Sequence, residues 1–247
     1  MTVASLALIG TTIVFSSFVS GVFGMAGGMV LLAVLLTQFD VTTTMVLFSI
    51  VQIGTNGLRA VHWRKFVIWP IFWKYVVGAV LAFAIMRFIA FVPEKWMVYV
   101  LLGTLPFMVE LLPREMRPSI QWRGIPFVSG FLTTIVQLMA GVGGMFLDLF
   151  FQKSTLDRKT TNATKAVTQT FSHLLRGAYF FSLSGVGELS ATLWAPAVVL
   201  ALIGGALAPF VVERMTDDGF RQWTRWIIFV LAGISLLRGG WLLWQGY

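Results

Sequence analysis

The stretch GVFGMAGGM, at Gly21–Met29, interrupts an apolar part of the chain and recurs as LMAGVGGM at Leu138–Met145. The chain around it is 57% hydrophobic and 11% charged, whereas soluble globular domains carry about 25% charged residues. Apolar runs of about 20 residues, long enough for a helix to cross a bilayer, recur along its length. The sequence therefore predicts an all-α polytopic membrane protein in which each glycine stretch breaks or reverses a helix.

Eight apolar blocks are expected to form membrane helices, and a short apolar tail follows each glycine stretch. The blocks cover residues 3–20, 43–62, 66–90, 95–112, 125–140, 161–182, 190–212 and 223–244. Each tail, 28–37 or 144–152, rises only about 15 Å as a helix, half of a hydrocarbon core of about 30 Å. Neither tail can span alone, so each glycine stretch is either a re-entrant hairpin or a pair of crossings with one short arm.

The chain reads as an internal repeat, because both the glycine motif and a polar helix face recur in order. The motif Gly27-Gly28-Met29 matches Gly143-Gly144-Met145. The following helix of each half carries polar residues at i, i+4 and i+7, which share one helix face. These residues are Gln52, Asn56 and Arg59 in the first half, and Gln169, His173 and Arg176 in the second. We expect a first transmembrane repeat at 1–112, a cytoplasmic connection at 113–123 and a second repeat at 124–247.

The basic residues between the apolar blocks indicate how the two halves are oriented. If each broken segment crosses the membrane once, five basic residues lie on one side and seven on the other. If each broken segment returns to its side of entry, one side carries ten basic residues and the other carries only Arg87 and Lys95. Those ten are Arg64, Lys65, Arg114, Arg117, Arg123, Lys153, Arg158, Lys159, Arg214 and Arg221. The positive-inside rule favours the second arrangement, which gives inverted repeats typical of secondary transporters and puts both termini outside.

A glycine break at membrane depth frees backbone groups that must face protein or a water-filled cavity. The helices that restart after Gly28 and Gly144 each present unpaired N–H groups and a positive dipole end, which suit an anion. Glycines in membrane helices also serve as packing surfaces. Because the break recurs beside a matching polar face, we favour a binding site in which Gly27, Met29, Gly143 and Met145 also take part.

The polar faces have two interpretations. Gln52, Asn56, Gln169 and His173 either contact a ligand or form interhelical hydrogen bonds. Lys165 lies one turn before Gln169 and either adds positive charge for an anion or snorkels to the boundary. For Arg59 and Arg176, which lie nearer the helix ends, snorkelling is the favoured expectation.

Asp148 is the one acid inside a short apolar tail. It is either a proton-carrying group or a carboxylate paired with Lys165, His173 or another cation. Asp148 and His173 are therefore the candidate coupling residues. With two histidines and no cysteine, the sequence predicts no metal site, no cofactor and no enzyme activity. The net charge of +8 falls mostly in loops and does not predict nucleic-acid binding.

GVFGMAGGM, its second copy AGVGGM and the polar helix after each resemble the TauE/SafE family of membrane transporters. By position, Gly24, Gly27 and Gly28 correspond to the first glycine motif, and Gly141, Gly143 and Gly144 to the second. The resemblance implies an exporter of small sulfur-containing anions, such as sulfite or organosulfonates, in a bacterial inner membrane. Its partners would be that anion and the lipid bilayer, with self-association left open.

Other functions remain open at this stage. An anion channel could use the same site without coupling, and a transporter could carry another small anion such as a carboxylate. An assembly protein could use its glycines and glutamines only to pack helices. The favoured prediction is an alternating-access exporter.

Overall fold

A computed structural model describes residues 2–23, 26–184, 191–207 and 217–246 of the chain. Every regular element among these residues is a helix, which confirms the expected all-α class. The described α-helices are α1 (Val3–Phe23), α2 (Ala26–Gln38), α3 (Val41–His62), α4 (Trp69–Ile89), α5 (Lys95–Leu111), α6 (Ile125–Ala140), α7 (Gly143–Phe151), α8 (Arg158–Ser184), α9 (Ala191–Leu207) and α11 (Asp217–Trp244). Two 3-10 helices, η1 (Arg64–Phe66) and η2 (Arg114–Met116), follow α3 and α5.

Within the described residues, four helices are long and apolar enough to cross a membrane: Val3–Val22, Val41–His62, Trp69–Ile89 and Arg225–Trp244. The short helices α2 and α7 have 13 and 9 residues. At 1.5 Å per residue they rise only about 20 and 14 Å, less than the hydrocarbon core. The two expected short arms are therefore confirmed as short helices, and four of the eight expected blocks form helices long and apolar enough to span within the described residues.

In the second glycine stretch, the helix α6 ends at its C-cap residue, Gly141. This residue has φ of +74°, a left-handed conformation that glycine adopts without the penalty of a side chain. Its N–H bonds to the Gln137 carbonyl and closes α6, and α7 begins two residues later. In the first stretch α1 ends at Phe23 and α2 begins at Ala26, while Gly24 lies outside the described residues.

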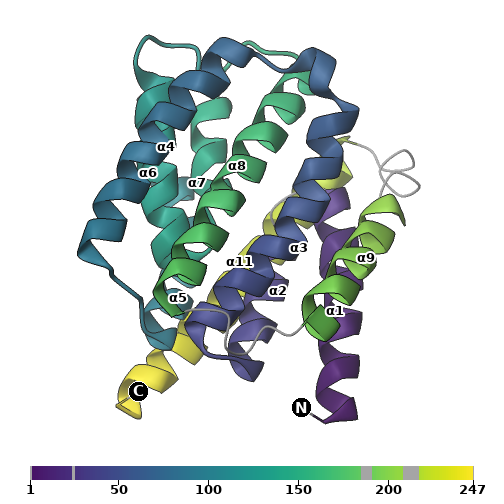
Figure 1. The fold of residues 1–247 in the computed structure, drawn as a ribbon. Coiled ribbons are helices and arrows are strands. Elements are labelled where there is room, and N and C mark those ends of the chain that lie inside the picture. Colours follow the sequence, from purple (N-terminus) through teal and green to yellow (C-terminus); the bar gives the residue numbers. More distant parts are fainter. Residues whose placement is uncertain (1, 24–25, 185–190, 208–216, 247) are drawn as a thin grey trace.

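Helices distant in sequence pair across the molecule. The most extensive contacts join α3 with α8, α4 with α6, α5 with α11, and α1 with α9 (Figure 1). In the central pair, Gly177 of α8 approaches Ser49 of α3, and Gly57 of α3 approaches Thr170. Residue numbers rise along one helix as they fall along the other, so α3 and α8 run antiparallel.

The two chain ends lie at the same end of the helix assembly (Figure 1). The connections after α3, α5 and α7 meet at the opposite end, where the Ile68 N–H donates to Thr164 Oγ1 at 3.1 Å. There the Ile120 N–H donates to the Phe150 carbonyl at 2.7 Å. The chain therefore turns back after each glycine stretch to the end from which it came.

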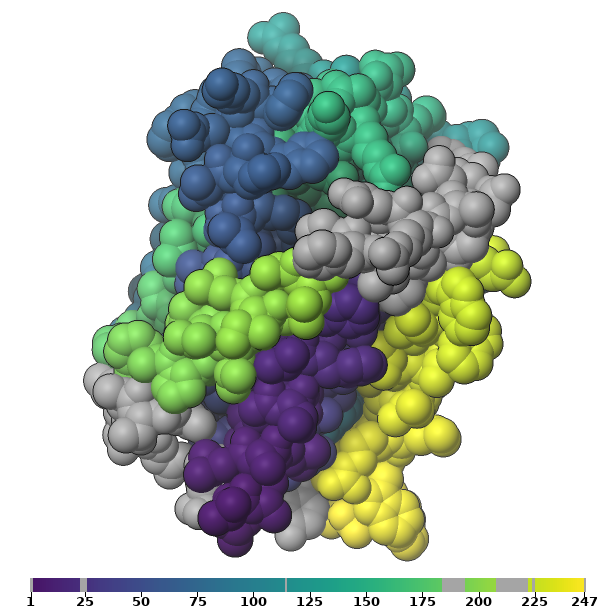
Figure 2. Space-filling view, turned by 90° about the vertical axis from the view of Figure 1, so that its right-hand side faces the viewer, coloured from purple at the N-terminus to yellow at the C-terminus, as the bar shows by residue number. Residues whose placement is uncertain are grey.

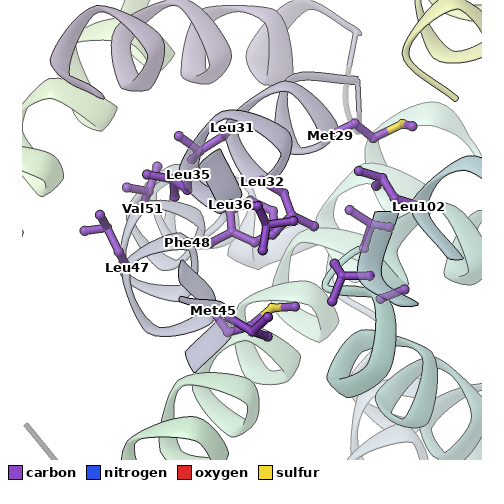
Figure 3. Packing of buried hydrophobic residues seen from close by; sticks show 14 of the residues in the cluster. Met29, Leu31, Leu32, Leu35, Leu36, Met45, Leu47, Phe48, Val51 and Leu102 are labelled. Atoms are coloured by element: carbon purple, nitrogen blue, oxygen red, sulfur yellow. The ribbon is translucent and has the colours of Figure 1, made fainter. Parts of the chain in front are cut away.

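The short helix α2 is enclosed by protein. Its buried Met29, Leu31, Leu32, Leu35 and Leu36 lie against α3 and Leu102 of α5 (Figure 3). The outer face formed by α1, α9 and α11 (Figure 2) instead exposes large apolar side chains, as a lipid-facing surface does. The start of α2 at Ala26, Gly27 and Gly28 is thus enclosed by protein and does not face lipid.

Candidate functional site

The two glycines at the start of α2 have different surroundings. A Cβ added at Gly27 would collide with the backbone of α1 at Ser16. A Cβ at Gly28 would lie 3.1 Å from Nε2 of Gln52 and 3.4 Å from Cζ of Phe48. Gly27 therefore lets α1 and α2 touch, as the packing interpretation holds, whereas Gly28 brings the start of α2 against polar and aromatic groups of α3.

The start of α7 is held by a residue that the sequence analysis missed, Gln137 of α6. Its Oε1 accepts a hydrogen bond from the Gly143 N–H, and its Nε2 lies 2.7 Å from Nδ1 of His173. A Cβ at Gly143 would lie 2.7 Å from that same Oε1. The sequence does show Gln137 as a lone amide inside the apolar block 125–140. The matching position of the first half is Gly21, so the repeat does not point to Gln137.

The amide of Gln137 also determines the tautomer of His173. Because Oε1 is the acceptor of the Gly143 bond, the amide NH2 donates to Nδ1 of His173. In the neutral ring the proton then lies on Nε2, an assignment that follows from the hydrogen-bond network. His173 is thus left with one N–H donor.

Arg176 is fully buried, and the expectation that it snorkels is wrong. Its Nε donates to Ser49 Oγ at 2.8 Å, its Nη1 donates to the Gly141 carbonyl, and its guanidinium lies 4.2 Å from the centre of the Phe48 ring. Within the described residues, Nη2 has no hydrogen-bond partner and no acid pairs with this cation. Since α8 packs centrally and continues to Ser184, Arg176 has no free path to an interface.

Phe48 connects the two broken helices. Its buried ring faces the start of α2 at Gly28 on one side and carries the guanidinium of Arg176 on another. The ring centre is also 6.2 Å from that of His173 in an edge-on contact. Through Arg176, the same ring reaches the Gly141 carbonyl at the end of α6. The start of α2 and the end of α6 therefore meet at one buried cluster.

The polar face of α3 is bonded mainly within its own helix. Asn56 is buried and donates to the Gln52 carbonyl at 3.0 Å, and Arg59 donates to the Asn56 side chain at 2.8 Å. Thr55 Oγ1 donates to the Gln52 side-chain oxygen at 3.3 Å. Arg59 is half-buried and tied to α3 by Asn56.

Asp148 pairs with Lys165, one of the two alternatives expected for this acid. The side chains expose 21% and 22% of their surface, while Oδ1 of Asp148, the oxygen paired with Lys165, is buried. It lies between the buried cluster and the end of the molecule where Thr164 bonds to Ile68. Lys165 and Arg176 are thus separated along α8, and Asp148 of α7 lies with Lys165.

The remaining residues of the expected site are either buried or half-buried. Met29 and Met145 are buried directly after the glycine pairs, while Gly144 and Gln169 are half-buried. The groups that face one another around Phe48 are mainly hydrogen-bond donors and one cation. Chemically, such a cluster can hold an anion and offers no nucleophile paired with a base.

Comparisons with known proteins identify the family of the chain. No curated protein and no solved structure matches the chain. The model of the family described as sulfite exporter TauE/SafE matches residues 8–236 of the 247. Members of this family are membrane transporters. The match covers nearly the whole chain and confirms the resemblance drawn from the glycine motifs, and the protein therefore belongs to the TauE/SafE sulfite exporter family.

Proposed function

We propose that this chain exports a small sulfur-containing anion, sulfite or an organosulfonate, by alternating access. The observation that carries the proposal is Arg176, a buried cation with an unpaired Nη2 between two helix breaks. Taking such an ion out of water costs several kcal/mol, and its bonds to Ser49 and Gly141 supply no negative charge. A bound anion would supply that charge.

The donors around Arg176 support a compact anionic head group. The helix α2 starts beside Phe48 and Gln52, so the amides near Gly28 and Met29 lie at a positive helix end. Because Gln137 takes the Gly143 N–H, we assign the second set of amides to Gly144 and Met145. Side-chain bonds would come from Gln52, Asn56, Gln169 and the free N–H of His173, with Lys165 adding charge nearer the entrance.

We propose further that the chain consists of two inverted repeats, 1–112 and 124–247, joined by 113–123. Exchanging the halves maps α3 onto α8 and α5 onto α11, and each of these pairs is in extensive contact. The same exchange maps the α4–α6 pair onto the α9–α1 pair, and both are extensive as well. This symmetry of contacts supports rocking of one half against the other around a central site.

The orientation follows from charge. We propose that the end bearing the connections after α3, α5 and α7 is cytoplasmic, because those connections carry most of the loop lysines and arginines. Both termini would then face the periplasm of a bacterial inner membrane. Asp148 and His173 stay the candidate coupling residues.

A thermal-shift panel tests the anion site. Purified protein in detergent is heated with sulfite, sulfate, thiosulfate, sulfonates or carboxylates. An anion at 100 times its Kd adds about 2.7 kcal/mol, and we expect the melting temperature to rise by about 5 °C or more. Arg176→Gln should remove that rise, and the control Arg225→Gln, an exposed arginine paired with Glu110, should keep it. The absence of a shift with every anion would contradict the proposal.

Arg176 also ties α8 to α3, so Arg176→Gln could lose the fold as well as the site. Arg176→Lys keeps the charge and tests the site if the glutamine variant does not fold, since we expect it to bind anions more weakly. Saturable sulfite flux in proteoliposomes without unitary currents would separate a carrier from an anion channel.

A further inference from the structure

The ion pair of Lys165 with Asp148 occupies a semi-enclosed position. Each side chain exposes about one fifth of its surface, 22% for Lys165 and 21% for Asp148. Fully exposed pairs are screened and weak, whereas this pair is shielded on most sides. Oδ1 of Asp148, the oxygen paired with Lys165, is itself buried, so an anion would meet the pair at the exposed part of Lys165.

The pair lies on the approach to Arg176. Lys165, His173 and Arg176 are at i, i+8 and i+11 of α8, which fall on one helix face. Lys165 follows Thr164, which bonds to Ile68 at the end where three connections meet. Arg176 lies three turns further along, about 16 Å deeper. An anion moving along this face from that end reaches Lys165 before Arg176.

A second cation, Arg59 of α3, interacts electrostatically with the same carboxylate. Arg59 is held in place by its hydrogen bond to the Asn56 side chain. Asp148 is therefore attracted by one cation from each half of the chain.

We propose that Asp148 is a tethered competitor of the transported anion, holding Lys165 until an anion from this end displaces it. This inference rests on the proposed function. On displacement, an anion oxygen accepts the hydrogen bond of the Lys165 ammonium. The released carboxylate stays ionised and turns to Arg59. An anion with more than one negative charge, such as the sulfite dianion, competes better than a monocarboxylate. Asp148 would thereby contribute to selectivity.

The cations that interact with Asp148 are Lys165 from α8 and Arg59 from α3. The helix α6 carries no ionisable side chain, and Glu110 of α5 pairs with α11. Among the described residues, Asp148 is therefore the acid that competes with an anion for Lys165.

The experiment compares anion affinity in full-length wild type, Asp148→Asn, and Glu115→Gln as a control for an acid at the same end of the molecule. Methanesulfonate and sulfate are the probes, because neither titrates between pH 6 and 8. We expect Asp148→Asn to bind about fivefold tighter or more, in the range of typical coupling between sites. Glu115→Gln should match wild type.

The background variant Lys165→Gln makes the test specific. There, Asp148→Asn should no longer tighten binding, since the competition for Lys165 is already absent. Equal tightening in both backgrounds would show a general charge effect and overturn the proposal. If wild type binds anions and a folded Asp148→Asn variant binds them with the same affinity, this inference alone is overturned. Absence of binding in both would overturn the proposed function as well. If Asp148→Asn does not fold, Asp148→Ser takes its place in both backgrounds and is judged by the same outcomes.

Discussion

At the start of α2, a single methyl group distinguishes a packing role from a binding role. We expect Gly27→Ala to lower the free energy of unfolding by about 1–3 kcal/mol, because its Cβ would press into the α1 backbone at Ser16. Gly28→Ala should fold and weaken anion binding, because its Cβ meets the Gln52 amide at 3.1 Å. Melting temperature and anion affinity of both variants check this. Transport unimpaired in both would argue against a site at this helix start.

Gln137 offers a second test at the residue scale. Gln137→Leu would leave the Gly143 N–H and Nδ1 of His173 without their partner. Each unsatisfied buried group costs about 1–3 kcal/mol, so we expect a clearly lower melting temperature in detergent. Gln222→Leu, at an exposed position of α11, is the matched control and should melt close to wild type. Equal melting of the two variants would contradict the role of Gln137.

Residues that recur in both halves could be predicted from the sequence, and residues without a counterpart could not. Gly28, Gln52 and His173 stood out because matching positions share their character. Gln137 has Gly21 as its counterpart, so repetition gave no signal for it. The role of Arg176 was misjudged because snorkelling depends on which helices surround α8, and sequence spacing does not contain that information.

At the scale of elements, length and hydropathy predicted the helices well. The expected tails 28–37 and 144–152 correspond to α2 and α7. An apolar run of this size after a glycine break predicts a helix too short to span the membrane. Sequence could not tell that α2 would lie inside the protein. That burial depends on Leu102 and other residues of distant helices (Figure 3).

Asp40 caps the start of α3, where its Oδ1 accepts the Thr43 N–H at 3.0 Å. Partial burial raises the pKa of Asp40, but the hydrogen bonds from Thr43 outweigh it, and the net pKa lies below its ordinary value. A carboxylate with a lowered folded pKa stabilises fully above the unfolded value of about 3.9 and loses this effect as pH falls through the folded value. We expect Asp40→Ala to cost about 1 kcal/mol at pH 7.

The pH dependence of thermal unfolding checks this. The gap in melting temperature between wild type and Asp40→Ala should close in acid, below the pH at which wild-type Asp40 is protonated. A gap that stays constant down to the most acidic conditions would show that the carboxylate charge is not the cause.

At the scale of the whole molecule, the proposed rocking motion can be arrested at one point. A Cβ at Gly54 of α3 would lie 4.0 Å from Cβ of Ala201 in α9, a separation that suits a disulfide. The chain has no cysteine of its own, so Gly54→Cys with Ala201→Cys introduces a single defined pair. We expect oxidation to abolish transport and a reductant to restore it, while each single variant responds to neither. Undiminished transport with the disulfide formed would rule out relative motion at this contact.

Which helices pair across the molecule could not be read from the sequence. The repeat and the charge count predicted two similar halves, but the antiparallel contact of α3 with α8 depends on small residues such as Gly177 meeting Ser49. Such close approach depends on both surfaces at once, and a single sequence shows each surface only separately.

The burial of α2 has a consequence for how the protein is made. This helix is synthesised well before α11, yet it packs against α5 and α11 in the finished molecule. Until α11 is made, part of the surface of α2 lacks its final neighbour. Nascent chains that stop before α11 should therefore have an incompletely packed α2, which would mark them for cellular proteases.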